Sequence, residues 1–390
     1  MQPLELTAFH VRIPLRKPIQ HASHTRSETD NVLVRCVLPD GTEGFGEGVP
    51  REYVTGETID SALALLRHSD LAAQLEPCQD FPQAVALAER LRLAPVAGDD
   101  RGCQGNAARC AMELALLDAY GKRFGQPVSA VTRLAAPELC QPRAWVRYSG
   151  AITSARRGLK LRLAAWRMRI YGFHQVKVKV GIAGHDDLQR LRIIRGRLGS
   201  RVDIRIDANE AWTPADVVAR IQELEPFGLS AVEQPVPHAD ADALAEVRRQ
   251  VRVPLMLDES LCGPIDAERA VQRGTCDLFN LRLSKCGGFL PALRLAQFAR
   301  RHGLGCQLGC QVGETAVLSA AGRHFAASVA ELRYVEGSYD RHLVREALGL
   351  QDLTFRWGGW ARALPGPGLG LALDPVALER VTVRKENLLG

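Results

Sequence analysis

The stretch FHQVKVKVG, residues 173–181, places two lysines two positions apart inside a run that otherwise has the composition of a buried strand. Side chains alternate between the two faces of a strand, so Lys177 and Lys179 share one face and the three valines share the other. Two ammonium groups on a buried face cost free energy unless anionic groups neutralise them. The stretch therefore predicts a strand whose lysine face meets carboxylates or a bound anion.

A regular alternation of short apolar runs and amphipathic helical segments begins near Trp145. The apolar runs are AWVRYSG, HQVKVKV, VDIRIDAN, SAVEQPV, VPLMLDES, CDLFNLRLSKCGG, LGCQLGCQ and ELRYVEGS. Eight strands that alternate with helices predict an α/β fold, namely a parallel β/α barrel of the TIM type. We assign this barrel to residues 140–360.

Residues 1–130 have a different pattern, which predicts an α+β domain. The run NVLVRCVL, a turn at Pro39–Gly41 and the run TEGFGEG indicate a β-hairpin, and the helical period of NAARCAMELALLDAYGKRFG follows later. The first segment, MQPLELTAFHVRIPL, alternates like an edge strand. After Leu364 the run PGPGLGLALD is too rich in glycine and proline for a helix, so we expect residues 365–390 to return to this domain.

The composition argues against nucleic-acid and membrane partners. The net charge of +6 comes from 50 basic and 44 acidic residues, and the arginines are scattered along helical segments without forming an aromatic-rich patch. The chain has no run of about eighteen apolar residues, and its amino terminus has no secretory signal pattern. Ten cysteines without a C-x-x-C pattern indicate a reducing, cytoplasmic location. A small anionic substrate is the expected use of the positive charge.

One charged residue marks the predicted end of each of five successive barrel strands. These residues are Lys179, Asp207, Glu233, Asp258 and Lys285, and the gaps between them are 28, 26, 25 and 27 residues, about one βα unit each. Barrel enzymes place their chemistry at the carboxyl ends of the strands. We therefore expect all five side chains to meet in one active site.

The three acidic residues of this series predict a metal site. Carboxylates on adjacent strands repel one another unless a cation joins them, and an all-oxygen ligand set suits a hard ion. Mg²⁺ fits best, with Mn²⁺ as an alternative, because it prefers octahedral geometry and leaves positions for a substrate carboxylate.

The two lysines at the ends of the series predict proton transfer. The second and sixth strands of an eight-stranded barrel are opposite each other, so Lys179 and Lys285 are expected on opposite sides of the substrate. A lysine acts as a base when its pKa is lowered toward neutrality, and Lys177 together with the metal ion can lower it. Removal of a proton next to a carboxylate gives an enediolate, whose negative oxygens a divalent ion stabilises.

At these residues the chain resembles the enolase superfamily, and within it the muconate lactonizing enzyme subgroup. The motifs that carry the resemblance are KVKVG, DANEAW, EQP, LDES and NLRLSKCGG, with AARCAMELALLDAYGKRFGQPV and GPGLG outside the barrel. The resemblance implies a modified (β/α)8 barrel with an α+β N-terminal capping domain, and a homo-oligomer. It also implies that Lys179 and Lys285 are an acid/base pair and that Lys177 is the electrostatic partner of this pair. The metal ligands that it implies are Asp207, Glu233 and Asp258.

Departures from family patterns reduce the number of reactions that this chain is expected to catalyse. The run LGCQVGET after the seventh strand lacks the His that mandelate racemase-like members carry there, and that His would also serve an acid-sugar dehydratase. Dipeptide epimerases usually show Asp-x-Asp at the eighth strand, where this chain has YVEGSYD, with Glu336 and Asp340. Because these departures argue against the other reactions, we expect a muconate cycloisomerase-like reaction. Racemisation of an N-acyl amino acid or dipeptide, succinylbenzoate-forming dehydration and a barrel that only binds its ligand stay open.

Residues that choose the substrate are expected in two loops that, in this family, close over the barrel. These loops are IQHASHTRSE and VPREYVTGE. Arg51 in particular suits a second carboxylate of a small-molecule carboxylate substrate. The candidates for binding the substrate are His21, His24, Arg51, Tyr53, Glu336 and Asn209.

Overall fold

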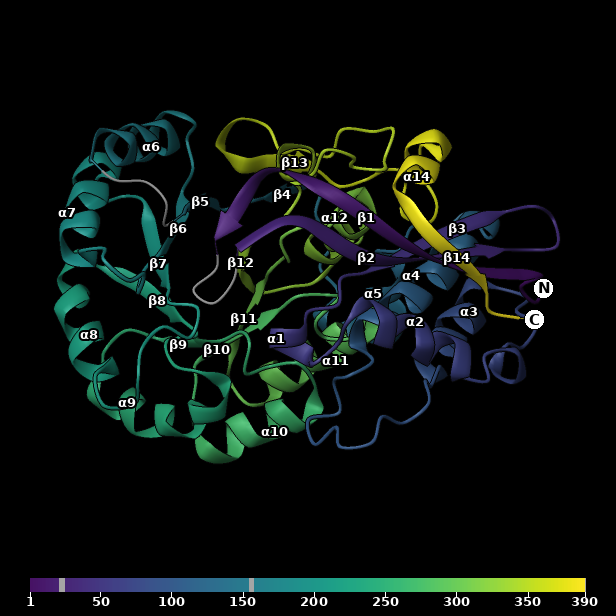
Figure 1. Ribbon diagram of the computed structural model, residues 1–390, viewed down its shortest axis with the longest axis horizontal. Coiled ribbons are helices and arrows are strands. Elements are labelled where there is room, and N and C mark those ends of the chain that lie inside the picture. Colours follow the sequence, from purple (N-terminus) through teal and green to yellow (C-terminus); the bar gives the residue numbers. More distant parts are fainter. Residues whose placement is uncertain (21–24, 154–157, 390) are drawn as a thin grey trace.

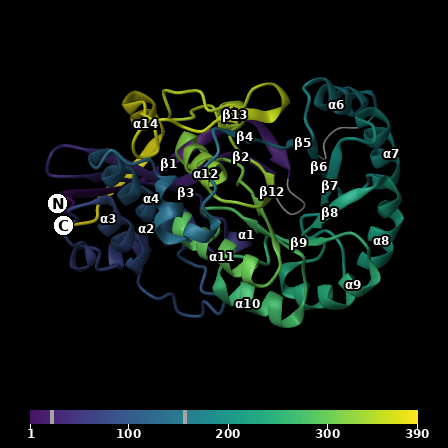
Figure 2. The ribbon, with the colours of Figure 1, turned by 180° about the vertical axis from the view of Figure 1, so that it is seen from behind.

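The computed structural model describes residues 1–20, 25–153 and 158–389 of the 390-residue chain. Figure 1 shows two bodies side by side: a barrel wrapped by helices, and a smaller unit made of an antiparallel sheet and helices. The two chain ends lie close together in the smaller unit, on the side away from the barrel (Figure 1 and Figure 2). The barrel is therefore built from the middle of the chain.

Eight parallel strands form the barrel in their order along the chain. They are β5 (Gly150–Ile152), β6 (Gln175–Lys179), β7 (Asp203–Asp207), β8 (Leu229–Glu233), β9 (Leu255–Leu257), β10 (Leu278–Leu281), β11 (Gly305–Leu308) and β12 (Leu332–Val335). The amide of Ser149, directly before β5, donates to the carbonyl of Val335 at 2.8 Å and joins the first strand to the eighth. The predicted α/β barrel is confirmed.

Helices connect successive strands and cover the outside of the barrel (Figure 1). They are α6 (Gly158–Ile170), α7 (Asp187–Leu198), α8 (Val217–Leu224), α9 (Leu244–Gln250), α10 (Pro264–Arg273), α11 (Phe289–Arg301) and α12 (Ala316–Ser328). After β12 comes the four-residue α13 (Asp340–Leu343), and the chain then runs to β13 (Trp360–Arg362), which pairs with β4 (Trp145–Arg147). The barrel is thus a modified one. No helix in the described parts of the chain is long and apolar enough to cross a membrane.

The smaller unit, here called the capping domain, holds the antiparallel sheet β14-β1-β2-β3. Its strands are β1 (Glu5–Gln20), β2 (Thr25–Val37), β3 (Glu43–Gly48) and β14 (Thr382–Asn387), and its helices include α1 (Glu52–Thr55), α2 (Ile59–His68), α3 (Phe81–Arg90), α4 (Asn106–Arg123), α5 (Ala130–Ala135) and α14 (Pro375–Val381). The edge-strand prediction for the amino terminus is wrong, because β14 pairs with β1 on the side away from β2. The boundaries at 130, 140, 360 and 365 stay a prediction.

Every second residue of β3 is a glycine, because the backbone of α4 lies directly against that face of the strand. Gly44, Gly46 and Gly48 share this face. The helix contributes alanines spaced four apart, which share one face of α4, at positions 107, 111, 115 and 119. A Cβ atom on Gly46 would lie 2.0 Å from the carbonyl oxygen of Ala111, so even a methyl group does not fit. This close approach fixes α4 against the sheet.

Replacing Gly46 with alanine is expected to lower the thermal stability of the protein. The added methyl group must push β3 away from α4, since the contacting atoms belong to the helix backbone and cannot rotate away. Overpacking a core costs about 1–3 kcal/mol, and we expect the upper end of this range. Differential scanning calorimetry of the Gly46→Ala protein would measure the shift of the unfolding midpoint.

Gly196→Ala is the matched control for this experiment. Gly196 is an exposed residue inside α7, and a Cβ atom there would meet nothing within 4 Å. Alanine is more favourable than glycine in a helix interior by about 1 kcal/mol, so this variant should keep or raise the unfolding midpoint. Equal midpoints for the two variants would show that the contact between β3 and α4 does not constrain the domain.

Candidate active site

The register of the parallel strands aligns predicted site residues at the carboxyl ends of β6, β7 and β8. Lys179 is paired with Asp207, and Asp207 with Glu233, on neighbouring strands. Two residues earlier, Lys177 is paired with Arg205. Asp207 is 1% exposed and Glu233 is fully buried. The charged residues of the predicted site are therefore collected inside the barrel.

Lys177 is surrounded by carboxylates. Its Nζ atom lies 3.4 Å from Oδ2 of Asp207 and 3.5 Å from Oε1 of Glu233. The carboxylate of Glu336, at the end of β12, lies 2.9 Å from the same atom. Burial alone would lower the pKa of Lys177, but the three carboxylates raise it above its ordinary value. Lys177 is therefore a fixed positive charge, and these contacts explain how the lysine face of β6 is tolerated inside the barrel.

Lys179 has a different environment, which favours its neutral form. Its Nζ donates to Oδ1 of Asn209 at 2.6 Å. Burial lowers the pKa of Lys179, and the charge of Lys177 lowers it further, while Asp207 acts in the opposite direction. Asn209 adopts a left-handed backbone conformation with φ of 45°, which turns its side chain back toward the strand ends. Lys179 is thus suited to accept a proton.

Lys285 lies in the loop after β10 and is 1% exposed. Its Nζ donates to the carbonyl of Asp258 at 2.6 Å and to the carbonyl of Asn280 at 2.9 Å. It also lies 3.1 Å from Oδ1 of Asp258. Burial lowers the pKa of Lys285, and nearby Arg282 lowers it as well. In the sheet order, β7, β8 and β9 separate β6 from β10, so the two lysines approach the barrel centre from opposite sides.

Two buried arginines that the sequence analysis did not single out complete the charge balance. Arg205 pairs with Glu336 and donates to the hydroxyl of Ser149 at 3.2 Å. Arg282 pairs with Asp258 and lies 3.9 Å from Glu233. Arg205 precedes Asp207 by two residues, so it shares the strand face of that residue. The alternation that drew attention to the lysines could therefore have found Arg205 too.

The carboxylates have the donor chemistry of a site for a hard divalent cation. Oδ2 of Asp207 and Oδ1 of Asp258 are buried and accept no hydrogen bond within the described ranges. Glu233 accepts from the side-chain amides of Asn280 at 2.8 Å and Gln307 at 3.5 Å. As they stand, no three acidic, His or Cys side chains in the described chain converge enough to hold one ion. Lys177 and Arg282, which bridge these carboxylates, now neutralise them. The oxygen donors fit Mg²⁺ in kind.

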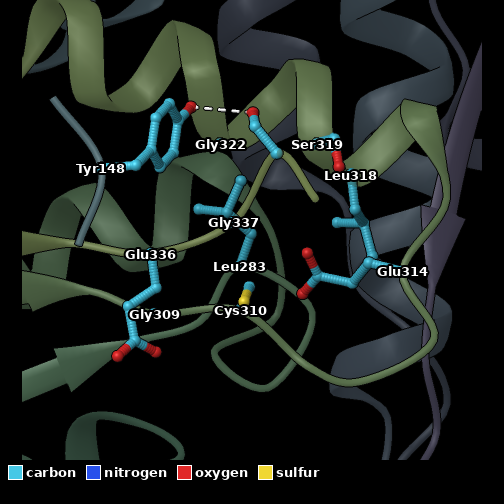
Figure 3. Close-up of a pocket in the computed structure, with 11 residues that line it drawn as sticks. Tyr148, Leu283, Gly309, Cys310, Glu314, Leu318, Ser319, Gly322, Glu336 and Gly337 are labelled. Atoms are coloured by element: carbon cyan, nitrogen blue, oxygen red, sulfur yellow. Dashed lines mark hydrogen bonds between the residues drawn. The ribbon is translucent and has the colours of Figure 1, made fainter. Parts of the chain in front are cut away.

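A small pocket, with room for about one water molecule, lies between the ends of β11 and β12 (Figure 3). Glu314 lines it, and burial raises the pKa of Glu314 to about 8. The hydroxyl of Ser338 donates to that of Tyr148 at 2.9 Å across one wall, as the dashed line in Figure 3 shows. Glu336 also lines this pocket, so the pocket adjoins the lysine cluster.

The remaining substrate-binding candidates lie in the capping domain or outside the described residues. His21 and His24 lie outside the described residues. Arg51 is 3% exposed and donates to the carbonyls of Pro50 and Val312, each at 2.7 Å. It therefore connects the capping domain to the loop after β11. A role of Arg51 toward a second substrate carboxylate stays a prediction.

Tyr53 is placed beside a further arginine. The guanidinium of Arg26 lies 5.5 Å from the centre of the Tyr53 ring, within the range of a cation–π contact. Among the candidates that the structure describes, Asn209 is hydrogen-bonded to Lys179 and Glu336 to Lys177.

Comparison with known proteins identifies the family to which this chain belongs. Residues 160–377 match the family described as "Enolase C-terminal domain-like". Residues 4–131 match "Mandelate racemase / muconate lactonizing enzyme, N-terminal domain". The chain belongs to the enolase superfamily. The resemblance carried by the motifs of the sequence is thereby confirmed.

Three relatives within the superfamily illustrate its reactions. The N-succinyl-L-Arg/Lys racemase of Bacillus cereus is 28% identical over 97% of this chain and 98% of its own, and its crystal structure has a TM-score of 0.85 over 99% of this chain and 100% of that one. A dipeptide epimerase of Cytophaga hutchinsonii, solved with Mg and D-Ala-L-Val, has a TM-score of 0.83 and is 25% identical, with both chains fully covered. The chloromuconate cycloisomerase of Cupriavidus pinatubonensis is 29% identical over 95% of this chain and 96% of its own.

Replacing Lys177 with methionine is expected to raise the pKa of Lys179. The positive charge of Lys177 disfavours protonation of Lys179, and its removal also leaves nearby carboxylates less neutralised, so both effects act in the same direction. NMR titration of protein labelled with ¹³C at the lysine ε-carbons would follow the Lys179 resonance, assigned with Lys179→Ala. Lys160→Met, which removes an exposed lysine on α6, is the control and should leave this titration unchanged. A lower pKa in the Lys177→Met protein would contradict the assigned role of Lys177.

Proposed function

We propose that this protein is a Mg²⁺-dependent isomerase that removes and returns the proton on the carbon next to a substrate carboxylate. The observation that carries the proposal is the pair Lys179 and Lys285. Lys285 is buried and Lys179 is half-buried. Both have a lowered pKa, and three strands separate the strands that lead to them. A protein that only binds its ligand would not need a potential base on each side of it.

The two lysines divide the proton transfer between them. In its neutral form, Lys179 accepts the α proton from one face of the substrate, and protonated Lys285 donates a proton to the opposite face. The reverse reaction exchanges these roles, which is the requirement for racemisation or epimerisation. Asn209, bonded to Nζ of Lys179 at 2.6 Å, orients one lysine, and the carbonyls of Asp258 and Asn280 orient the other.

Asp207, Glu233 and Asp258 are the residues that would hold Mg²⁺. When bound, the ion supplies positive charge to the carboxylate oxygens on which negative charge develops as the proton leaves. Support comes from the buried oxygens of Asp207 and Asp258 that accept no hydrogen bond in the described structure. The charge of Lys177 stabilises the same region, since its raised pKa keeps it protonated.

An N-acylated amino acid is the substrate class that the charges around Glu336 favour. Glu336 already pairs with Lys177 and with Arg205, so the ammonium of a dipeptide would have to compete with two fixed cations for it. An N-acyl group carries no ammonium and avoids this competition. The similarity to a racemase named for N-succinyl-L-Arg/Lys agrees with this inference.

Muconate cycloisomerisation is the second candidate. It was expected from the sequence by subtraction, and the 29% identity to a chloromuconate cycloisomerase supports it. The same lysines and carboxylates would serve both reactions, because both pass through a carbanion stabilised next to a carboxylate. A homo-oligomer and a cytoplasmic location stay predictions.

The test is deuterium uptake at the α-carbon, followed by ¹H NMR in D₂O with Mg²⁺. The panel contains both enantiomers of N-succinyl amino acids, dipeptides and cis,cis-muconate. We expect exchange and racemisation of an N-succinyl amino acid, while conversion of muconate to a lactone would select the cycloisomerase instead. No reaction with any member would favour a barrel that only binds its ligand.

The lysine variants separate the two proton-transfer roles. Lys179→Ala is expected to lose exchange with one enantiomer by at least about 100-fold, and Lys285→Ala to lose exchange with the other enantiomer similarly. Each variant should retain partial exchange with the enantiomer whose proton it still removes. Full turnover in either variant would contradict the two-lysine mechanism.

A further inference from the structure

A side-chain amide of the capping domain is hydrogen-bonded to the backbone that carries Lys285. Asn106, the first residue of α4, uses Nδ2 to donate to the carbonyl of Lys285 at 2.6 Å. The same Nδ2 donates to the carbonyl of Cys262 at 2.8 Å. An amide nitrogen has two hydrogens, so both are used on carbonyls of the barrel.

The two carbonyls belong to different active-site loops. Cys262 lies in the loop after β9, four residues beyond Asp258, and Lys285 lies in the loop after β10. The Nζ atom of Lys285 donates a hydrogen bond to the carbonyl of Asp258, so a hydrogen bond already joins the two loops. The Asn106 amide therefore joins them on the side that faces the capping domain.

Asn106 does not have the usual task of a polar residue at a helix start. The N-cap position of α4 is Gly105, which has no side chain, and the amide of Ala107 is satisfied by the carboxylate of Glu57 at 3.0 Å. The Asn106 side chain instead leaves its own helix to reach the barrel. A requirement of the helix end thus does not explain why asparagine stands here.

Neighbouring contacts between the two domains converge on the same loop. The amide of Val49 donates to the hydroxyl of Ser284 at 2.7 Å. The guanidinium of Arg109 donates to the carbonyl of Gly287 at 2.9 Å. A Cβ atom on Gly287 would lie 3.0 Å from Oδ1 of Asn106, so the loop and the asparagine are in close contact. The capping domain therefore holds the loop of Lys285 on both sides of the lysine.

Lys179 is held by the barrel. Its side chain bonds Asn209, and its carbonyl accepts from Nη1 of Arg190 on α7 at 2.8 Å. The two lysines of the proposed reaction thus differ in which domain sets their position.

We propose that Asn106 is a positioning residue that sets Lys285, but not Lys179, for proton transfer. The inference rests on the proposed function. It makes the capping domain part of one half of the reaction, in addition to covering the barrel. Loss of the Asn106 amide should impair proton transfer on one face of the substrate only.

Asn106→Asp is the sharpest test, because it keeps the size of the side chain and replaces both N–H donors by an acceptor facing two carbonyls. Asn106→Ala, which removes the side chain without adding charge, serves if the first variant does not fold. We measure initial rates of α-deuterium uptake for each enantiomer of an N-succinyl amino acid. We expect the rate assigned to Lys285 by the Lys285→Ala variant to fall about 10- to 100-fold, and the other rate by less than about 3-fold.

Asn31→Asp is the matched control. Asn31 is a fully buried asparagine of the capping domain whose Nδ2 likewise donates to two acceptors, Glu47 at 2.6 Å and the carbonyl of Gly313 in the loop after β11 at 2.8 Å. That loop carries neither lysine. If a substitution only loosens the domain interface, the rates of deuterium uptake into the two enantiomers should change equally. This applies to the Asn31 variant and to the Asn106 variants.

The outcomes separate the inference from the proposed function. Equal changes in both rates for the Asn106 variants, or no change, would overturn the positioning role while leaving the two-lysine reaction intact. If the wild-type protein exchanges neither enantiomer, the proposed N-acyl amino acid substrate is rejected. The positioning role is then decided by amide hydrogen exchange, which in the Asn106 variants must accelerate in residues 283–288 by a larger factor than in residues 176–180.

Discussion

The mutual neutralisation of charges inside the barrel is the constraint on which the rest of the structure depends. Lys177 lies within 3.5 Å of Asp207, Glu233 and Glu336, and removal of one partner from such a buried cluster costs about 3–5 kcal/mol. Because the strands are parallel and in register, the cluster forms only when β6, β7, β8 and β12 all take their places. The same cluster keeps Lys177 protonated and leaves Lys179, one step further along the strand face, with a lowered pKa.

The capping domain contributes to the site through its own packing. The glycine face of β3 lets α4 approach so closely that the helix has one fixed position, and Asn106 at the start of that helix reaches the loop of Lys285. Glu113, about two turns further along α4, accepts a hydrogen bond from the amide of Leu290 at the start of α11. A helix of one domain thus supplies contacts to the loop and helix that follow β10 in the other.

Much of the site followed from local pattern. The alternation of KVKVK predicts two lysines on one face, and the spacing of 25–28 residues predicts that Asp207, Glu233 and Asp258 end neighbouring strands. Arg282 escaped attention because an arginine inside an apolar strand run is ordinarily a surface residue, and its pairing with Asp258 depends on the packing of two loops. The edge position expected for β1 was wrong because its partner β14 comes from the opposite end of the chain.

The sequence by itself determined the barrel, the order of its charged strand ends and the superfamily, because period-two alternation and βα spacing are properties of the chain alone. Only the tertiary structure decided which charges pair, that the pKa of Lys177 is raised while that of Lys179 is lowered, and which domain contacts the loop of Lys285. Asn106 and Lys285 are 179 residues apart in sequence, and no local pattern relates them. Their contact arises because the folded α4 and the loop after β10 meet across the domain interface, where the distance between two groups, and not their separation along the chain, sets the interaction.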